Sequence, residues 1–299
     1  MVNYNYMKYK KINEIVGDTP LIEVGGIYAK LETTNPTGSI KDRMVKYIIE
    51  KALEKGDLKS GYGVMEVTSG NTGISLAMFS ALNGYKFTAI MPESMSPERI
   101  KMMEAFGANV ILTPAKEDMK GAVKVYEDMK KDNLETWYPD QFNNKDNITA
   151  HETGIGHEIL RQTGGAIDAF VAGAGTGGTV IGVARALKKL KRKIRIVVVE
   201  PEESAILTGK KAKTHGIQGI GEGFIPNILK ENLALIDEIL TVSTEDAIGA
   251  RLELGRKYGV LVGTSSGANF QAALQIKKRY KRVVTVFPDR GERYLSDIN

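Results

Sequence analysis

The sequence contains no cysteine, and only three of its 299 residues are histidine: His151, His157 and His215. A chain without cysteine forms no disulfide and offers neither a thiolate nucleophile nor a cysteine-ligated metal site. The three histidines also lack the close spacing of metal ligands. We therefore expect no metal site and no zinc chemistry.

Long apolar runs are absent as well. No segment approaches the roughly 20 apolar residues of a membrane-spanning helix, and the start, MVNYNYMKYKK, lacks the apolar stretch of a signal peptide. We therefore expect a cytoplasmic protein with no membrane partner. The net charge is only +5, and the one dense basic run, KKLKRK at 188–193, closes a predicted helix without interleaved aromatic residues. Because lysines are favoured at a helix C-terminus, no nucleic-acid partner is expected.

Short β-branched segments alternate with amphipathic segments along most of the chain, which is typical of βαβ units and a mostly parallel sheet. The expected strands are 63–67, 86–92, 108–114, 168–173, 193–200, 237–242, 259–263 and 282–288. A polar, turn-rich stretch at 133–150 interrupts the alternation and marks a crossing between domains. We predict an α/β protein with two open-sheet domains and a ligand in the crevice between them.

The segment NPTGSIKDR at 35–43 is unusual because of Lys41. Apolar residues after it repeat at helical spacing, so a helix is predicted from about Ser39, with Asp42 completing a capping box. Lys41 then lies in the first turn, where a cation is disfavoured by about 0.3–1 kcal/mol. A surface lysine can tolerate that position. Alternatively, Lys41 is an uncharged nucleophile beside an anion.

Small and polar residues gather at four predicted strand-to-helix junctions. These junctions are NPTGSIKDR (35–43), TSGNTG (68–73), GAGTGGT (173–179) and GTSSGA (263–268). Any one of them alone fits an ordinary turn with a helix cap. In GAGTGGT, however, Gly175, Gly177 and Gly178 allow close backbone approach, and Thr176 and Thr179 add hydroxyl donors. This combination at a helix N-terminus predicts an anion cradle suited to phosphate.

The same loop also fits a dinucleotide-binding fingerprint. Gly173, Gly175 and Gly178 have the G-x-G-x-x-G spacing, and Glu200 ends the following predicted strand. An NAD-dependent oxidoreductase is therefore a second hypothesis, and a catalytically idle binding protein is a third. The nicotinamide hypothesis gives no role to Lys41 or to TSGNTG.

Two further junctions, TSGNTG and GTSSGA, offer additional groups that could bind a ligand. TSGNTG offers Thr68, Ser69, Asn71 and Thr72 with the first amides of a helix, which suits a carboxylate. GTSSGA places Ser265 where its hydroxyl meets a ring nitrogen or caps the helix. An amine, a phosphate cradle, a carboxylate clamp and a hydroxyl together predict a phosphorylated aldehyde cofactor with an amino-acid substrate. Pyridoxal phosphate fits that description.

Taken together, these segments resemble those of a known family. The four junctions, with MPESMSPERIKMMEAFGA and GIQGIGEGFIP, are similar in order and sequence to the cysteine synthases, or O-acetylserine sulfhydrylases. The similarity runs from IVGDTPL near residue 15 to PDRGERYLS at the C-terminus. It implies the tryptophan-synthase-β-like fold, which is fold type II of the pyridoxal-phosphate enzymes, with the cofactor between two α/β domains.

The resemblance also implies how the chain is divided and what it does. The smaller, mobile domain would comprise 35–145 with 1–12, and the larger, phosphate-binding domain 13–34 plus 146–299. The enzyme would be a homodimer, and the C-terminal tail of a serine acetyltransferase is a possible partner. Its reaction would be a β-replacement through an α-aminoacrylate, converting O-acetyl-L-serine and sulfide to L-cysteine and acetate.

Individual roles follow from the same resemblance. Lys41 would form the Schiff base, Asn71 would bond the cofactor's ring hydroxyl oxygen, residues 175–179 would hold its phosphate, and Ser265 would face the pyridine nitrogen. The residues expected to bind the substrate are Thr68, Ser69, Asn71, Thr72, Gln141 and Gly219.

Two departures from the family pattern bear on the substrate. NPTGS also occurs in O-phosphoserine sulfhydrylases and threonine synthases, so a phosphoserine-using or cystathionine β-synthase-like β-replacement is an alternative. Glu222 replaces a residue that is often small in the family. Phosphoserine-using relatives carry an arginine just before the EGF element, where this chain has Gln218. We therefore predict O-acetyl-L-serine as the better substrate.

Overall fold

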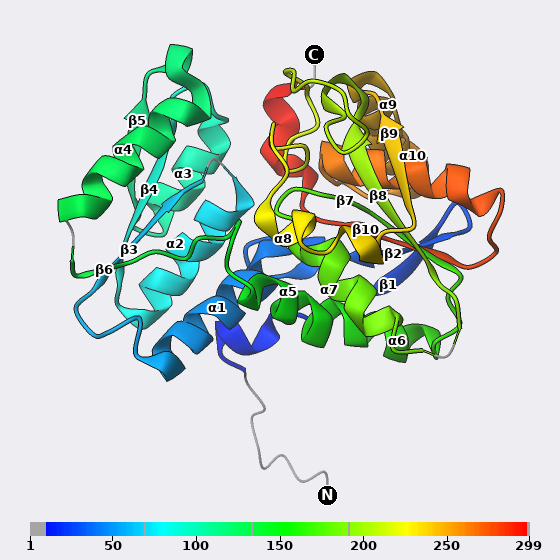
Figure 1. Cartoon of the computed structure of the whole chain (residues 1–299), viewed down its shortest axis with the longest axis horizontal. Helices are drawn as coiled ribbons and strands as arrows, with labels where there is room; N and C mark the ends of the chain where they lie inside the picture. The colour runs from blue at the N-terminus through cyan, green and yellow to red at the C-terminus, as the bar shows by residue number, and fades with distance from the viewer. Residues whose placement is uncertain (1–9, 69, 133, 191, 298–299) are drawn as a thin grey trace, which may run out of the picture.

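The computed structural model describes residues 10–68, 70–132, 134–190 and 192–297. Within these ranges the strands form two sheets, and each sheet lies in its own lobe in Figure 1. Both sheets carry helices on their two faces (Figure 1). The predicted α/β class with two open sheets is therefore confirmed. No helix in the described ranges is both long and apolar enough to cross a bilayer.

The smaller sheet has four parallel strands in the order β5-β4-β3-β6. They are β3 (Gly63–Val67), β4 (Lys86–Pro92), β5 (Asn109–Thr113) and β6 (Thr136–Trp137). Helices α1 (Lys41–Lys55), α2 (Asn71–Asn83) and α3 (Pro97–Ala105) cover one face, and α4 (Asp118–Asp132) covers the other. Successive strand residues alternate between these faces, so Val64 packs in the first core and Met65 in the second.

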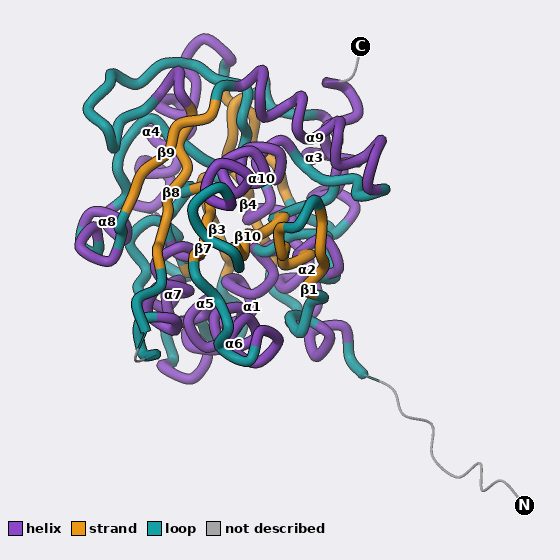
Figure 2. Tube along the Cα trace, turned by 90° about the vertical axis from the view of Figure 1, so that its right-hand side faces the viewer, coloured by secondary structure: helices purple, strands orange, loops and turns teal. Residues whose placement is uncertain are grey.

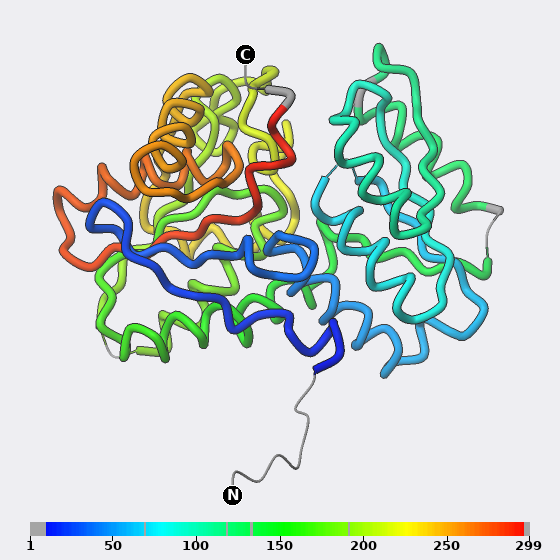
Figure 3. Tube along the Cα trace, turned by 180° about the vertical axis from the view of Figure 1, so that it is seen from behind, coloured from blue at the N-terminus to red at the C-terminus, as the bar shows by residue number. Residues whose placement is uncertain are grey.

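The larger sheet has six strands in the order β1-β2-β10-β7-β8-β9. They are β1 (Leu21–Val24), β2 (Ile27–Leu31), β7 (Ala169–Gly173), β8 (Arg195–Pro201), β9 (Glu238–Val242) and β10 (Val283–Phe287). The β1–β2 hairpin is antiparallel and the other pairs are parallel. Because β2 pairs with β10, an early (blue) and a late (red) segment of the chain run side by side in the large lobe (Figure 3).

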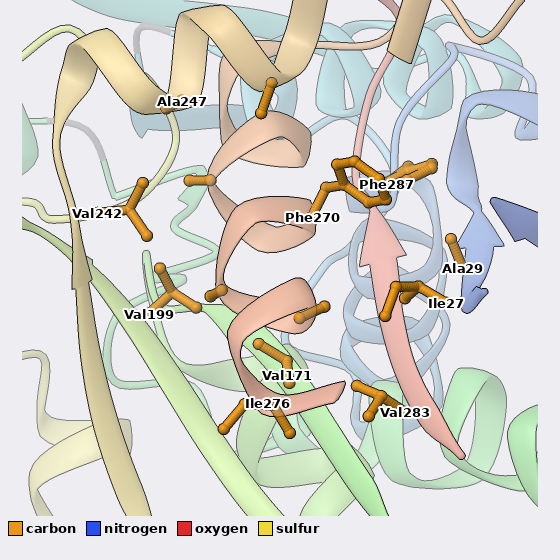
Figure 4. Close-up of a cluster of buried hydrophobic side chains, with 14 of the residues drawn as sticks. Ile27, Ala29, Val171, Val199, Val242, Ala247, Phe270, Ile276, Val283 and Phe287 are labelled. Atoms are coloured by element: carbon orange, nitrogen blue, oxygen red, sulfur yellow. The ribbon is translucent and has the colours of Figure 1, made fainter. Parts of the chain in front are cut away.

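Helices cover both faces of the large sheet. Helices α9 (Thr244–Tyr258) and α10 (Thr264–Lys277) lie on one face (Figures 1 and 2). Helices α5 (Asp146–His151), α6 (His157–Thr163), α7 (Gly178–Leu187) and α8 (Asn227–Lys230) lie on the other. Figure 4 shows Phe270 of α10 beside Phe287 of β10, with ring centroids 6.4 Å apart. Both sheets are thus buried between helix layers, as parallel sheets require.

One predicted strand, 259–263, is wrong. Helix α9 ends at Tyr258, α10 begins at Thr264, and between them only Val262 forms an isolated bridge, to Arg290. The positions beside β10 are already occupied by β2 and β7. Val262 is buried in the core around α9 and α10 and Val260 packs against that core, whereas Leu261 is half exposed. The apolar pattern therefore reflects packing against these helices and not a place in the sheet.

Candidate functional site

A cavity of about 430 Å³ lies between the two lobes. Its walls include Val67, Gly173 and Val286, which lie at the carboxyl ends of β3, β7 and β10. The ends of parallel strands are where open α/β sheets bind ligands, as the sequence predicted. The predicted site residues that line it are Lys41, Thr68, Asn71, Thr72, Gln141, Gly175, Thr176, Gly177, Thr179, Gly219 and Ser265. Gly178 is buried behind the wall, and Ser69 lies outside the described residues.

Lys41 begins α1 and faces this cavity. The predicted capping box before it is wrong, because Ile40 is the N-cap and makes no side-chain cap bond; the Ser39 hydroxyl accepts from Lys41 N, at 3.3 Å. Asp42 instead accepts hydrogen bonds from the Thr37 backbone N–H (2.7 Å) and the Ser75 hydroxyl (2.5 Å). The loop before α1 runs along the end of β10, so it cannot take the capping geometry. Asp42 therefore ties the loop to α2 and holds the start of α1 in place.

Burial lowers the pKa of the Lys41 ammonium, while the carboxylates of Glu222 and Asp289 partly oppose that shift. The neutral amine is therefore more populated than on an exposed lysine. A neutral amine is the form that attacks a carbonyl carbon and that accepts a proton. The sequence-based interpretation of Lys41 as a nucleophile has the electrostatic setting it needs.

The loop before α7 leaves no room for a side chain at two of its glycines. A Cβ on Gly175 would lie 2.6 Å from the Gly219 carbonyl oxygen, and one on Gly178 would overlap the Asn147 side-chain amide. Thr176 Oγ1 accepts from Asn147 Nδ2 at 3.0 Å and from Gly178 N at 3.3 Å. The loop thus brings bare backbone against the cavity at a helix N-terminus, where amides and the helix dipole favour an anion.

The start of α2 faces the loop from the other lobe. Thr68 Oγ1 accepts from the Gly73 backbone N–H at 3.1 Å, and the Thr72 hydroxyl donates to Gln141 Oε1 at 2.7 Å. Thr72 and Gln141 are both buried, although 69 residues separate them. The donors predicted to bind a carboxylate are thus gathered on one wall.

Asn71 connects the two lobes. Its Nδ2 donates to Asp289 Oδ2 at 2.7 Å, and Arg293 donates to its Oδ1. The Tyr294 hydroxyl also donates to Asp289, at 2.6 Å. Asp289 and Arg293 belong to the PDRGERY segment and were not singled out from the sequence, because their role depends on a contact between distant segments.

Two other cavity residues were missed. Arg99 of α3 lines the wall on the side of the small sheet, with its guanidinium 5.2 Å from the centre of the Tyr294 ring. His215 Nδ1 accepts from Ile217 N at 3.2 Å, and its Nε2 therefore donates to the Gly221 carbonyl at 2.8 Å. His215 holds the loop that carries Glu222 against the cavity. Arg99 lies in the segment MPESMSPERIKMMEAFGA and His215 just before GIQGIGEGFIP, but no local pattern marks either as a cavity residue.

Ser265 lies in the first turn of α10, is only 4% exposed and lines the cavity. Glu200, in contrast, does not line it. Both Glu200 carboxylate oxygens accept backbone hydrogen bonds, from Leu207 N at 2.8 Å and Thr208 N at 3.1 Å. A ribose hydroxyl would need those same oxygens, so the nicotinamide hypothesis is not favoured.

The residues present suit a phosphorylated aldehyde. The cavity combines an amine with a lowered pKa, bare amides at the start of α7, hydroxyl donors at the start of α2 and a buried neutral hydroxyl on α10. Each group meets one chemical feature of pyridoxal phosphate or of an amino acid joined to it.

Comparisons with known proteins agree with this chemistry. The family described as "Pyridoxal-phosphate dependent enzyme" matches residues 12–289. A cysteine synthase of Staphylococcus aureus is 44% identical over 297 aligned residues, which cover 95% of each chain.

Solved structures are similar over the whole fold. A cysteine synthase of Entamoeba histolytica has a TM-score of 0.92 and 41% identity, covering 99% of this chain and 92% of that one. An O-acetylserine-dependent cystathionine β-synthase of Helicobacter pylori has a TM-score of 0.91 and 38% identity, covering 97% and 98%. These matches confirm the resemblance found in the sequence. The chain belongs to the pyridoxal-phosphate-dependent enzymes.

Proposed function

We propose that this protein is a cysteine synthase, which replaces the acetoxy group of O-acetyl-L-serine with sulfide to give L-cysteine and acetate. The observation that carries the proposal is one cavity in which Lys41 faces both the start of α7 and the start of α2. That arrangement offers an amine, a phosphate cradle and a carboxylate clamp together. The names of the S. aureus and E. histolytica relatives support the same reaction.

The cavity offers a group for each part of the cofactor. Lys41 would hold the aldehyde carbon, and residues 175–179 would hold the phosphate through backbone amides and the hydroxyls of Thr176 and Thr179. Asn71 would donate a hydrogen bond to the ring hydroxyl oxygen, and Ser265 would face the ring nitrogen. When bound, the cofactor supplies an electrophilic carbon and a ring that accepts electrons.

The chain itself binds the substrate and moves the proton. Thr68, Thr72 and Gln141 would hold the substrate carboxylate, so that the α-hydrogen points to Lys41. The amine of Lys41, once released from the cofactor, would take the α-proton as acetate leaves and return it after sulfide has added. Ser265 carries no charge, so it would leave the ring nitrogen largely unprotonated, which favours elimination over transamination.

We also propose that residues 35–145, with 1–12, form a smaller mobile domain that closes on the larger domain of 13–34 plus 146–299. Contacts across the cavity mouth support this division. The rings of Phe142 and Phe224 lie 5.3 Å apart, and Asn227 donates to Asn143 at 2.6 Å. A carboxylate drawn to the start of α2 would pull this wall inward and exclude water from the reaction. Of the segment 1–12, residues 1–9 lie outside the described residues.

The family resemblance supports three further parts of the proposal. The enzyme would act in the cytoplasm as a homodimer, and a serine acetyltransferase C-terminal tail would dock at the cavity mouth. The half-exposed ring of Phe224 at that mouth suits an apolar residue of such a tail. Sedimentation of the purified protein, with and without a peptide of that tail, tests both associations.

A direct experiment tests the proposed activity. The purified protein should be yellow, should form cysteine from O-acetyl-L-serine and sulfide, and after borohydride treatment should carry the cofactor on a peptide containing Lys41. Lys51→Ala, at a partly exposed position of the same helix outside the cavity, should change none of these results, because Lys51 contacts Glu54 and the Tyr47 ring and not the cavity. A colourless protein that binds NAD would contradict the proposal.

The leaving group gives a sharper prediction. A phosphate leaving group carries nearly two negative charges and needs a cationic partner. The cavity wall formed by the loop before α8 instead presents Gln218, which is neutral, and the carboxyl of Glu222. We expect faster acetate release from O-acetyl-L-serine than phosphate release from O-phospho-L-serine, both measured before sulfide is added. Gln218→Arg should raise kcat/KM for phosphoserine about tenfold or more through a charge-assisted hydrogen bond.

Gln218→Met is the matched control, because it keeps the length of the side chain without adding charge. A preference for phosphoserine in the unaltered protein would contradict the substrate assignment alone. No change in Gln218→Arg would mean that another group contacts the leaving group.

A further inference from the structure

His151 is a buried titratable residue to which the proposed reaction gives no role. It ends α5, is 2% exposed, and its Nε2 lies 3.4 Å from Thr179 Oγ1. Its Nδ1 is buried and finds no hydrogen-bond partner in the described part of the chain. Buried polar atoms are nearly always paired, so this arrangement calls for an explanation.

The fold brings His151 to Thr179 by an unusually close helix contact. Directly after His151 the chain forms a π-helical turn, Glu152–Gly156, a feature often found at functional sites. On α7, a Cβ at Gly182 would lie 2.7 Å from His151 Cβ, so the two helices touch at backbone distance. Thr179 lies three residues before Gly182, on the same face of α7. The imidazole is therefore placed against the Thr179 hydroxyl.

The surroundings keep the ring uncharged. Burial lowers the pKa of His151 well below its usual value, and the positive charges of Lys41 and Arg43 lower it further. A neutral imidazole carries one proton, on Nδ1 or on Nε2.

The two tautomers differ in what they leave unpaired. With the proton on Nδ1, that atom would be a buried N–H without an acceptor, and Nε2 would accept a hydrogen bond from the Thr179 hydroxyl. A proton on Nε2 can donate to Thr179 Oγ1 and leaves only a lone pair unpaired on Nδ1. Orphaned buried N–H groups are the rarer and costlier case, so the Nε2–H tautomer is favoured.

We propose that His151 is a positioning residue, which donates its Nε2–H to Thr179 and so leaves the Thr179 hydroxyl proton available to the cofactor's phosphate. A phosphate dianion accepts hydrogen bonds only. If the Thr179 hydroxyl instead donated its hydrogen bond to the imidazole, it would present only lone pairs to the phosphate, which is repulsive. The inference rests on the proposed role of residues 175–179 in binding phosphate.

The tautomer can be measured directly in the unaltered protein. With ¹⁵N-labelled histidine, NMR should show a proton on Nε2 and none on Nδ1 of His151, with and without cofactor. The chain has three histidines, so loss of one set of signals in His151→Gln assigns them. A proton on Nδ1, or on both nitrogens, would overturn the proposal.

A double-mutant cycle on cofactor affinity tests the consequence. Cofactor-free protein is titrated with pyridoxal phosphate. Thr179→Val should raise Kd about ten- to a hundredfold, and His151→Leu about tenfold. His151→Gln, whose amide can still donate, should stay within about threefold of the parent. In the Thr179→Val background, His151→Leu should add nothing, because the hydroxyl it positions is gone.

The outcomes separate this inference from the proposed function. Unchanged affinity in Thr179→Val would remove Thr179 from the phosphate cradle. Weakened affinity in Thr179→Val, with an equal additional loss from His151→Leu in both backgrounds, would instead show that His151 does not act through Thr179. Thermal melting of each cofactor-free variant checks folding, and if His151→Leu does not fold, the tautomer measurement alone decides.

Discussion

Lys41→Ala is expected to lower the rate of cysteine formation by more than about a thousandfold, because one amine serves both as nucleophile toward the cofactor and as base toward the substrate. The fold should persist. The Lys41 side chain faces the cavity, while Asp42 and Arg43, which follow it, anchor the start of α1 through their own hydrogen bonds. Single-turnover kinetics and circular dichroism would measure the two effects separately.

The cofactor should still bind Lys41→Ala through the phosphate cradle, but borohydride should no longer attach it to the protein. Lys51→Ala provides the comparison at a partly exposed position of the same helix, outside the cavity, where about the parental rate is expected. Turnover of Lys41→Ala within tenfold of the parent would refute the assignment of this lysine.

Arg43→Met is expected to destabilise the protein by about 3–5 kcal/mol, since it removes one partner from a buried charge network. The Arg43 guanidinium donates to Glu32 Oε2 and Glu158 Oε1, each at 2.6 Å, and Lys30 donates to Glu158 at 2.7 Å. Glu32 is fully buried, so without Arg43 its charge would remain in the interior with only neutral donors. Urea unfolding at neutral pH measures the loss.

The same network predicts a pH dependence. Burial opposes ionisation of Glu158, but hydrogen bonds and charge from Arg43, helped by Lys30, lower its pKa to about 2. A carboxyl whose pKa is lower in the folded state stabilises the fold above its unfolded pKa, and this contribution is lost as the pH falls toward the folded value. Stability should therefore drop between about pH 4.5 and 2. Arg43→Met should show a shallower drop, whereas Lys257→Ala, at an exposed pair, should match the parent.

Local signals in the sequence predicted much of this structure. The strand segments 63–67 and 86–92 match β3 and β4, because alternation and turn residues are encoded within a few positions. The glycines of 173–179 likewise indicated close backbone approach, and the Gly219 carbonyl lies where a Gly175 side chain would be. The predicted cavity at the strand ends followed from the rule for open parallel sheets.

Other features depended on contacts between distant segments. Asp42 matched a capping-box pattern, yet its carboxylate turns to Thr37 and Ser75 because the loop before α1 is held along β10. The apolar run 259–263 connects two helices and buries Val262 in their core, and its composition alone could not distinguish that from a strand. Arg99 and Asp289 reach the site only through the packing of whole elements, so no local pattern marked them.

The pairing of β2 with β10 sets the order in which a newly made chain can become functional. Tyr28 lies opposite Val284, and Asn71 meets Asp289 across 218 residues of sequence. At roughly 5–20 residues per second, a ribosome needs about 10–45 s to make those 218 residues. During that interval β2 has no β10 neighbour, and the nascent chain exposes an unpaired strand edge. The cofactor site can therefore be completed only after β10 and Asp289 have left the ribosome. A ribosome stalled before β10 would leave an aggregation-prone fragment unable to retain the cofactor.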